Sequence, residues 1–186
     1  EIDFRQRMSD LVRLAREANV TFYAIKPSGL SAGPDSAQVD SLLTLARADE
    51  GRFDLHREPV PLEPLIHEVF ETALILGEDA GLSVSLPVVE PATVLGDRTR
   101  LRQLFLNLVT NAIKYTPRGG RVELQATSDH RTVEIRVSDT GLGINEQHLP
   151  RIFDRLYRGD QSRATRGLGL GLSLVRAYVE AQGGTV

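Results

Sequence analysis

The pattern of apolar and polar residues divides this chain into five predicted helices and several short strands. Alternating residues predict two neighbouring, half-buried strands over residues 121–127 and 132–138, and shorter strands are predicted over residues 20–25 and 83–86. Both element types therefore contribute to the fold, in an order without internal repeats. The predicted helices cover residues 5–18, 39–49, 64–80, 98–115 and 171–182.

Proline and glycine mark the predicted boundaries. Residues 26–36 are rich in Pro, Gly and Ser and are typical of a linker. Three prolines at positions 59, 61 and 64 open a new region, and Pro64 suits the first turn of the next helix. A chain of 186 residues suits one domain and a remnant. We expect a helix–strand remnant and linker over 1–38, a helix end over 39–58, and the main domain over 59–186.

The helix predicted over 98–115 carries the first candidate chemistry. Asp97 is its expected N-cap, and Pro117 ends it. At about 100° per residue, Asn107, Asn111 and Lys114 share a face. Two amide oxygens one turn apart suit a hard cation such as Mg²⁺, and the lysine suits a phosphate. The alternative is an ordinary solvated face. The expected core stripe is Leu101, Leu104, Phe105, Leu108 and Ala112.

A carboxylate turn follows the second of the two alternating strands. In Asp139-x-Gly141-x-Gly143 the carboxylate can accept a hydrogen bond from the exocyclic amine of adenine, and the glycines allow a close approach to the ring. The alternative is a common strand-ending turn. Tyr115 is placed to stack on a base or to pack in the core.

A glycine-rich loop opens the last helix. Gly167-x-Gly169-x-Gly171, followed by Leu172, offers free N–H groups and a positive helix end to phosphates. The alternative is a flexible connector. The dinucleotide-binding fingerprint requires a strand directly before the glycines, but residues 160–166 are charged and loop-like. That interpretation is therefore rejected.

The region between these two glycine motifs is rich in arginine. Over residues 145–166 such side chains suit the stabilisation of charge on a phosphoryl group, or else form a solvated loop. Phe153 is expected to anchor the segment rather than to touch a ligand. The arginines are Arg151, Arg155, Arg158, Arg163 and Arg166.

Composition narrows the function classes further. A net charge of −3 gives no reason to expect nucleic-acid binding, and the absence of cysteine excludes disulfides, thiolate metal sites and a cysteine nucleophile. No apolar run has the length needed to span a bilayer, and no signal peptide is visible. We predict a cytoplasmic segment, whose parent protein could still be membrane-anchored.

Four stretches in this order resemble the N, G1, F and G2 boxes of sensor histidine kinases. They are NLVTNAIKYT at 107–116, DTGLG at 139–143, IFDRLYR at 152–158 and RGLGLGL at 166–172. The resemblance covers residues 59–186 and implies the Bergerat ATP-binding fold, an α+β two-layer sandwich with helices on one face of a mixed, mainly antiparallel sheet. Residues 42–51 resemble the end of the second helix of the dimerisation and phosphoacceptor domain.

The resemblance also implies cofactors and roles. The cofactors are ATP and Mg²⁺, with Asn111 on the metal and Asn107 nearby. Lys114 would meet phosphate, Tyr115 would lie by the base, and Asp139 would bind adenine. The implied partners are a phosphoacceptor histidine domain and a response regulator.

The chain departs from this family at the phosphoacceptor. The family's acceptor motif, similar to H-E-x-x-T-P, is absent, and His67-Glu68 lies in the wrong predicted helix without the proline. We interpret His56, His67, His130 and His148 as ordinary histidines and expect weak or no self-phosphorylation. Dimerisation is uncertain without the first dimerisation helix. In the family, further strands that close the sheet would follow Val186. This sequence does not contain them, and we expect their absence to leave a sheet edge exposed.

Three functions fit these observations. The first is a kinase domain that delivers the γ-phosphoryl group of ATP to a histidine elsewhere. The second is a conformational ATPase of the gyrase-like and Hsp90-like kind, which places a glutamate at the position of Asn107; an amide cannot act as a general base. The third is a nucleotide-binding but non-catalytic interaction module. The sequence favours the kinase.

Overall fold

The computed structural model describes residues 56–129, 132–159 and 168–186. All of them belong to one compact unit that spans Leu55–Val186. The helices predicted over 5–18 and 39–49, the strand over 20–25 and the linker over 26–36 lie outside the described residues. The domain boundaries near residues 38 and 58 therefore stay predictions.

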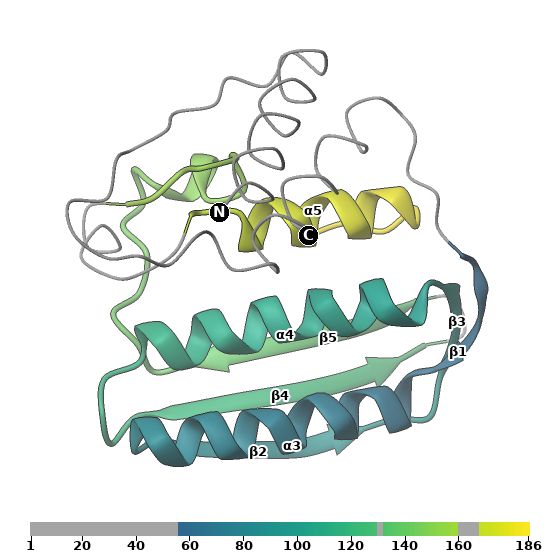
Figure 1. Ribbon diagram of the computed structural model, residues 1–186, viewed down its shortest axis with the longest axis horizontal. Coiled ribbons are helices and arrows are strands. Elements are labelled where there is room, and N and C mark those ends of the chain that lie inside the picture. Colours follow the sequence, from purple (N-terminus) through teal and green to yellow (C-terminus); the bar gives the residue numbers. More distant parts are fainter. Residues whose placement is uncertain (1–55, 130–131, 160–167) are drawn as a thin grey trace, which may run out of the picture. The chain divides into compact units, whose positions relative to one another are not determined.

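Two helices cover one face of a three-stranded sheet (Figure 1). The central strand, β4, pairs in parallel with β2 and antiparallel with β5. β1 and β3 form a separate antiparallel pair, and α5 packs on α4. This architecture is the predicted α+β sandwich. The elements are β1 (Glu58–Pro61), α3 (Leu62–Ala80), β2 (Ser83–Val89), β3 (Thr93–Gly96), α4 (Arg98–Tyr115), β4 (Arg121–Ser128), β5 (Val133–Asp139), the short 3-10 helix η1 (Leu149–Arg151) and α5 (Gly171–Ala181).

The core lies between the sheet and α3 and α4. Every second residue of β4 is buried, namely Val122, Leu124 and Ala126, while the residues between them lie on the other, more polar face. This period of two is the one that the sequence predicts for a half-buried strand. The helices contribute residues at helical spacing, among them Leu65, Ile66, Val69, Leu104, Phe105 and Val109.

The bounds of α4 agree with the predicted helix. Asp97 is its N-cap, and its Oδ1 accepts a hydrogen bond from the backbone N of Arg100 at 3.1 Å. The helix ends at Tyr115, and Thr116 takes an extended conformation before Pro117. One part of the predicted core stripe is wrong, since Leu108 is only half-buried and Val109 is buried instead. The buried stripe is wider than predicted because α4 packs against α3, the sheet and α5.

The sequence analysis missed two strands, β1 and β3. β1 and β3 pair over four residues each, where the sequence predicted a proline-marked boundary and a loop. Prolines 59 and 61 are two residues apart, so the N–H groups that they lack lie on the same side of β1, which has one partner strand among the described residues. β2 also runs past its predicted end at Leu86 to Val89, because a register irregularity between Ser85 and Val88 accommodates Pro87 at the sheet edge.

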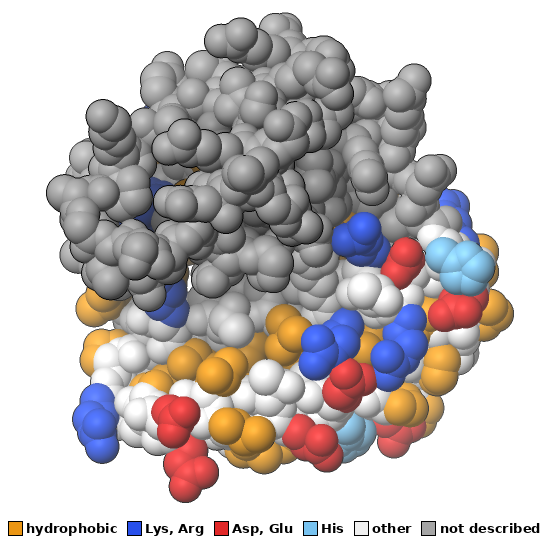
Figure 2. All heavy atoms as spheres, in the orientation of Figure 1, with side chains coloured by type: hydrophobic (Ala, Val, Ile, Leu, Met, Phe, Trp, Pro, Cys, Tyr) orange, Lys and Arg blue, Asp and Glu red, His pale blue; other side chains and the backbone are white. Residues whose placement is uncertain are grey.

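The helix-covered face carries charged side chains of both signs, seen in Figure 2. Glu68 on α3 accepts hydrogen bonds from two arginines of α4, from Arg102 Nε and from Arg98 at 2.8 Å. Hydrogen bonds from Arg102 and Arg98 hold the pKa of the Glu68 carboxyl below its ordinary value. No helix among the described residues has the length and apolarity to cross a membrane.

Candidate functional site

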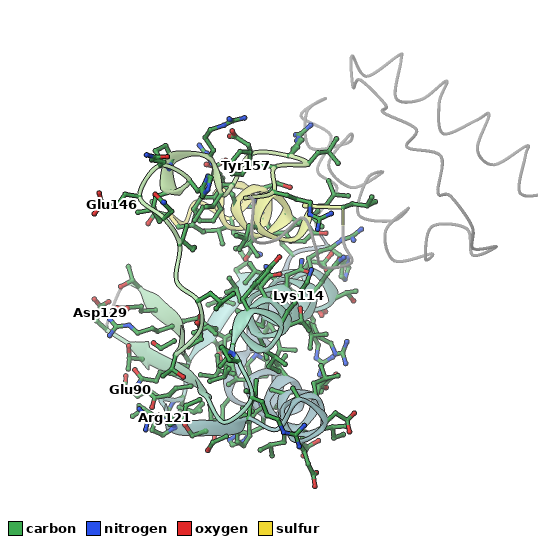
Figure 3. All side chains as sticks on the ribbon, turned by 90° about the vertical axis from the view of Figure 1, so that its left-hand side faces the viewer. Glu90, Lys114, Arg121, Asp129, Glu146 and Tyr157 are labelled. Atoms are coloured by element: carbon green, nitrogen blue, oxygen red, sulfur yellow. The ribbon has the colours of Figure 1, made fainter. Side chains whose placement is uncertain are left out.

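The helix α4 carries the polar side chains that the sequence assigned to a site. Asn107, Asn111 and Tyr115 follow one another at intervals of four residues, so they lie along one side of the helix. Lys114 is exposed near the helix end, and its Nζ lies 5.2 Å from the centroid of the Tyr115 ring. Figure 3 shows Lys114 on α4, between the sheet layer and α5. These residues form a line along which a ligand can be held.

The first residue of α5 lies against the two asparagines. A Cβ added at Gly171 would lie 3.5 Å from Asn111 Nδ2 and 3.8 Å from Asn107 Oδ1. Asn107 Nδ2 is buried and has no hydrogen-bond partner among the described residues. A buried amide without a partner is costly, by about 1–3 kcal/mol. The N-terminal end of α5, whose first N–H groups have no partner within the helix, therefore lies next to an amide that has no acceptor among the described residues.

The carboxylate turn after β5 packs on the other end of α4. A Cβ added at Gly141 would lie 2.6 Å from both Asp139 Oδ1 and the carbonyl oxygen of Tyr115. The backbone N of Gly141 donates to Asp139 Oδ1 at 2.8 Å, and that of Leu142 donates to the carbonyl of Tyr115 at 3.1 Å. Gly143 has a φ of +68°, a conformation that suits glycine. The turn is thus fixed beside Tyr115, with Asp139 exposed.

Thr140 is a positioning residue that the sequence analysis missed. Its Oγ1 accepts a hydrogen bond from the backbone N of Arg121 at 2.9 Å, and its own N donates to the carbonyl of Arg121 at 3.0 Å. These two bonds tie the turn to the start of β4. The available signal was a threonine directly after a strand-ending aspartate, since a hydroxyl can bond to nearby backbone groups.

The arginine-rich segment reaches the glycine loop through Tyr157. Gly169 has a φ of +72°, and a Cβ there would lie 2.7 Å from the carbonyl oxygen of Tyr157 and 3.0 Å from Arg158 Cγ. Arg155 is exposed and Arg158 is half-buried. Arg151 forms an ion pair with Asp154 at 3.3 Å. Phe153 is half-buried, and Arg163, Arg166 and Gly167 lie outside the described residues.

Two groups of predicted residues are therefore brought together, one at each end of a line on α4. Asp139, Gly141 and Tyr115 meet at the C-terminal end of the helix, and Gly171 meets Asn107 and Asn111 one to two turns earlier. In the described part of the chain, no three His, Cys, Asp or Glu side chains cluster as metal ligands. The amide oxygens of the two asparagines are the candidate metal ligands.

Comparison with known proteins identifies the family. Residues 96–186 match the family described as histidine kinase-, DNA gyrase B- and HSP90-like ATPase. The signal transduction histidine-protein kinase BaeS of Escherichia coli K12 is 35% identical over 150 residues, which are 80% of this chain and 32% of BaeS. The solved mycobacterial sensor histidine kinase MprB is 30% identical, with a TM-score of 0.60 over 68% of this chain and 80% of that one. The chain belongs to this ATPase family.

Within the family, the likeness is to two-component sensor histidine kinases. Full-length ShkA, solved in complex with AMPPNP, matches 96% of this chain and 40% of its own, with 27% identity and a TM-score of 0.63. The phosphate regulon sensor protein PhoR of Pseudomonas aeruginosa is 34% identical over 155 residues, or 82% of this chain and 35% of PhoR. The chain spans about a third of the length of the curated relatives it matches.

Proposed function

We propose that this chain binds Mg-ATP and transfers the γ-phosphoryl group to a histidine of a phosphoacceptor domain, elsewhere in the parent protein or in trans. A response regulator would receive the phosphoryl group next, as in two-component signalling. The observation that carries the proposal is the arrangement along α4. Gly171, the first residue of α5, lies beside Asn107 and Asn111 of α4. The turn that carries Asp139 lies beside Tyr115, which is also on α4.

The adenine end is assigned to Asp139 and Tyr115. Oδ1 of Asp139 is engaged by the backbone N of Gly141, which leaves the second carboxylate oxygen to accept from the exocyclic amine of adenine. Gly141 and Gly143 allow the backbone to approach the ring closely, and Tyr115 lies by the base. In Asp139→Asn, the side-chain oxygen could still accept from the backbone N of Gly141. The amide NH2 group, a donor, would then face the exocyclic amine of adenine, which is also a donor.

The phosphate end is assigned to the start of α5 and to the face of α4. Backbone N–H groups around Gly167, Gly169, Gly171 and Leu172 would meet the phosphates at the positive end of the helix. Asn111, with Asn107 nearby, would hold Mg²⁺, which offsets the negative charge of the phosphates. The buried amide nitrogen of Asn107, which has no hydrogen-bond partner in the described part of the chain, fits this assignment because a phosphate oxygen is a suitable acceptor. Lys114, in the last turn of α4, would supply a further positive charge for the phosphates.

Phosphoryl transfer depends mainly on position and charge. The bond between the γ-phosphorus and the bridging oxygen of ADP breaks as a bond forms to an imidazole nitrogen of the acceptor, and the electron pair leaves with ADP. Arg155 and Arg158 would stabilise the charge that spreads over the transferring group. Asn107 occupies the position where a hydrolase of this family needs a base, and an amide cannot activate water, so kinase chemistry is favoured over a conformational ATPase.

The acceptor is expected outside this chain. His56 and His67 are exposed among the described histidines, but neither lies in an acceptor motif. His148 is already hydrogen-bonded to Tyr157. We therefore expect weak or no self-phosphorylation by this chain, and labelling of a phosphoacceptor domain added in trans. Label on the chain's own histidines that survives base but not acid would contradict this expectation.

Calorimetry of ATP binding, with and without Mg²⁺, tests the proposal. We expect micromolar to sub-millimolar affinity, stronger with Mg²⁺, and a loss of about tenfold or more in Asp139→Asn, because an adenine hydrogen bond is replaced by two facing donors. Glu134→Gln is the matched control, since it removes one negative charge from the same strand, where Glu134 is exposed and pairs with Arg136. Absence of binding by a folded chain would mean a broken nucleotide site, and would leave an interaction module without nucleotide or a degenerate fragment.

A further inference from the structure

We propose that Tyr157 is a positioning residue for the γ-phosphoryl group. It is held in place by His148 and Arg151, and in turn it fixes Arg158 and the glycine loop before α5. The inference rests on the proposed function, because it assigns a task to residues around the same nucleotide. It adds three residues, His148, Arg151 and Tyr157, whose side chains the site description leaves without a role at the ligand.

In the segment before the glycine loop, the side chains of His148, Arg151 and Tyr157 form a cluster. His148 Nδ1 and the Tyr157 hydroxyl oxygen are 2.7 Å apart, the length of a good hydrogen bond. The guanidinium carbon of Arg151 lies 4.3 Å from the centroid of the Tyr157 ring, within the range of a cation–π contact. Arg151 is held in turn by Asp154 at 3.3 Å. The cluster ties η1 and its N-cap His148 to Tyr157, nine positions after His148.

The backbone of the same tyrosine bears on the glycine loop. Gly169 packs so closely on the carbonyl oxygen of Tyr157 and on Arg158 Cγ that a Cβ would lie 2.7 Å and 3.0 Å from them. Figure 3 shows Tyr157 beside α5, on the side of the molecule away from the sheet. A shift of Tyr157 must therefore move Arg158 or displace Gly169. Gly169 lies two residues before Gly171, which faces the asparagines of α4.

The backbone next to this cluster is strained. Leu156 has a φ of +57° and is the one non-glycine residue with a positive φ in the described part of the chain. Such a conformation persists only where the surroundings enforce it, and it is frequent at functional sites. The contacts on Tyr157 supply that enforcement directly beside Leu156. If the hydrogen bond to His148 is lost, the turn at Leu156 is free to relax, and Arg158 loses its fixed direction.

The proposal makes a selective prediction for ATP over ADP. Arg158 is assigned to the γ-phosphoryl group, which ADP lacks, so loosening Arg158 should weaken ATP binding and leave ADP binding nearly unchanged. A general loss of folding would weaken both nucleotides together. If Tyr157 had only a structural role, its substitution would leave the ratio of the ATP and ADP affinities unchanged.

The experiment compares the dissociation constants of Mg-ATP and Mg-ADP by calorimetry in the full chain, Tyr157→Phe, His148→Phe and the double variant. We expect ATP affinity to fall about three- to tenfold in each single variant, the effect of one hydrogen bond, with ADP affinity changed less than twofold. The double variant should be no weaker than the single ones, because both remove the same bond. His148→Phe keeps the proposal testable if Tyr157→Phe does not fold.

Tyr178→Phe is the matched control. Its hydroxyl is also hydrogen-bonded, to Gln103 Oε1 at 3.1 Å, but it lies in the buried contact between α5 and α4. We expect it to leave the ATP-to-ADP affinity ratio unchanged. An unchanged ratio in Tyr157→Phe or His148→Phe, in a chain that does bind ATP, would overturn this inference and leave the proposed function intact. Failure of the unaltered, folded chain to bind ATP would instead overturn the proposed function, and this inference with it.

Discussion

Two regions differ in the contacts that hold them in place. The first, called the layer, is the three-stranded sheet with α3 and α4, and the second is the segment after β5, residues 140–159. In β4 the inward residues Val122 and Leu124 are 0% and 1% exposed. In the segment after β5, Leu142 is 60% exposed and Ile144 is 52% exposed. The first region is held by buried apolar contacts, and the second by individual hydrogen bonds and close glycine contacts.

The difference assigns separate tasks to the two regions. Under the proposed function, the layer would supply the groups whose positions must not vary, since Asn107 and Asn111 are carried by a helix that packs on three sides. Under the same proposal, the segment after β5 would supply charge from Arg155 and Arg158, and it is positioned by individual contacts such as the hydrogen bond between His148 and Tyr157. A substitution of a buried apolar residue in the layer should therefore act on stability, and one in the segment mainly on binding.

The largest expected effect comes from a cavity in the layer. Leu124→Ala removes a fully buried side chain from the central strand and should lower the free energy of unfolding by about 2–5 kcal/mol. Leu142→Ala, at an exposed position, should change it by less than about 0.5 kcal/mol. Urea denaturation followed by circular dichroism measures both. Equal losses in the two variants would show that the segment after β5 is as tightly packed as the sheet.

A smaller effect on stability, but a large one on binding, is expected at the contact between the segment and the glycine loop. Gly169→Ala places a Cβ 2.7 Å from the carbonyl of Tyr157 at a φ of +72°. The positive φ alone costs about 1–2 kcal/mol, and the clash forces the loop away. We expect the free energy of unfolding to fall by no more than about 2 kcal/mol and ATP affinity to fall about tenfold or more.

Gly183→Ala is the control for that variant. Gly183 also has a positive φ, of +79°, but no atom lies within 4 Å of an added Cβ. It should show the same backbone penalty without the loss of ATP affinity in calorimetry. If both variants bind ATP as the unaltered chain does, the contact between Gly169 and Tyr157 has no part in holding the nucleotide.

Relief of the strained backbone should have a still smaller effect. In Leu156→Gly the penalty of a positive φ, about 1–2 kcal/mol, disappears, while glycine adds about 0.5–1 kcal/mol of entropy to the unfolded chain. The Leu156 side chain is 42% exposed, so its removal costs little buried apolar area. The free energy of unfolding should therefore stay within about 1 kcal/mol of the original value in urea denaturation. A loss of more than about 1 kcal/mol would mean that packing of the Leu156 side chain stabilises the fold.

How far the sequence predicts the molecule follows the same division. The bounds of α4, its Asp97 cap and the alternation of β4 depend on local patterns, and the structure confirms them. The short strands β1 and β3 were missed, because proline normally argues against a strand and four residues hold too little alternation to overrule it. For the same reason, Pro87 led the sequence analysis to end β2 at Leu86 and to miss its second half.

The contacts of the candidate site could be predicted only in part. The motifs identify which residues carry chemistry, such as Asn111 and Asp139. They do not say that Gly169 packs on Tyr157 or that Thr140 bonds to the start of β4, because these contacts join residues from different elements without any shared periodicity. The cluster of His148, Arg151 and Tyr157 is invisible in the sequence for the same reason. Such contacts depend on how the elements pack.

The smallest expected effect lies on the surface of the layer itself, where exposed charges should contribute little. Because Arg102 and Arg98 lower the pKa of the half-buried Glu68 carboxyl, the folded state favours its ionised form. This contribution is present above the ordinary pKa of about 4.5 and is lost as the pH falls through the lower pKa of the folded state. Glu68→Gln should therefore be slightly less stable than the unaltered chain in urea at pH 7, and the gap should close near pH 3. Glu71→Gln, at an exposed position on the same helix, is the control. A gap that persists at pH 3 would mean that Glu68 acts through packing and not through its charge.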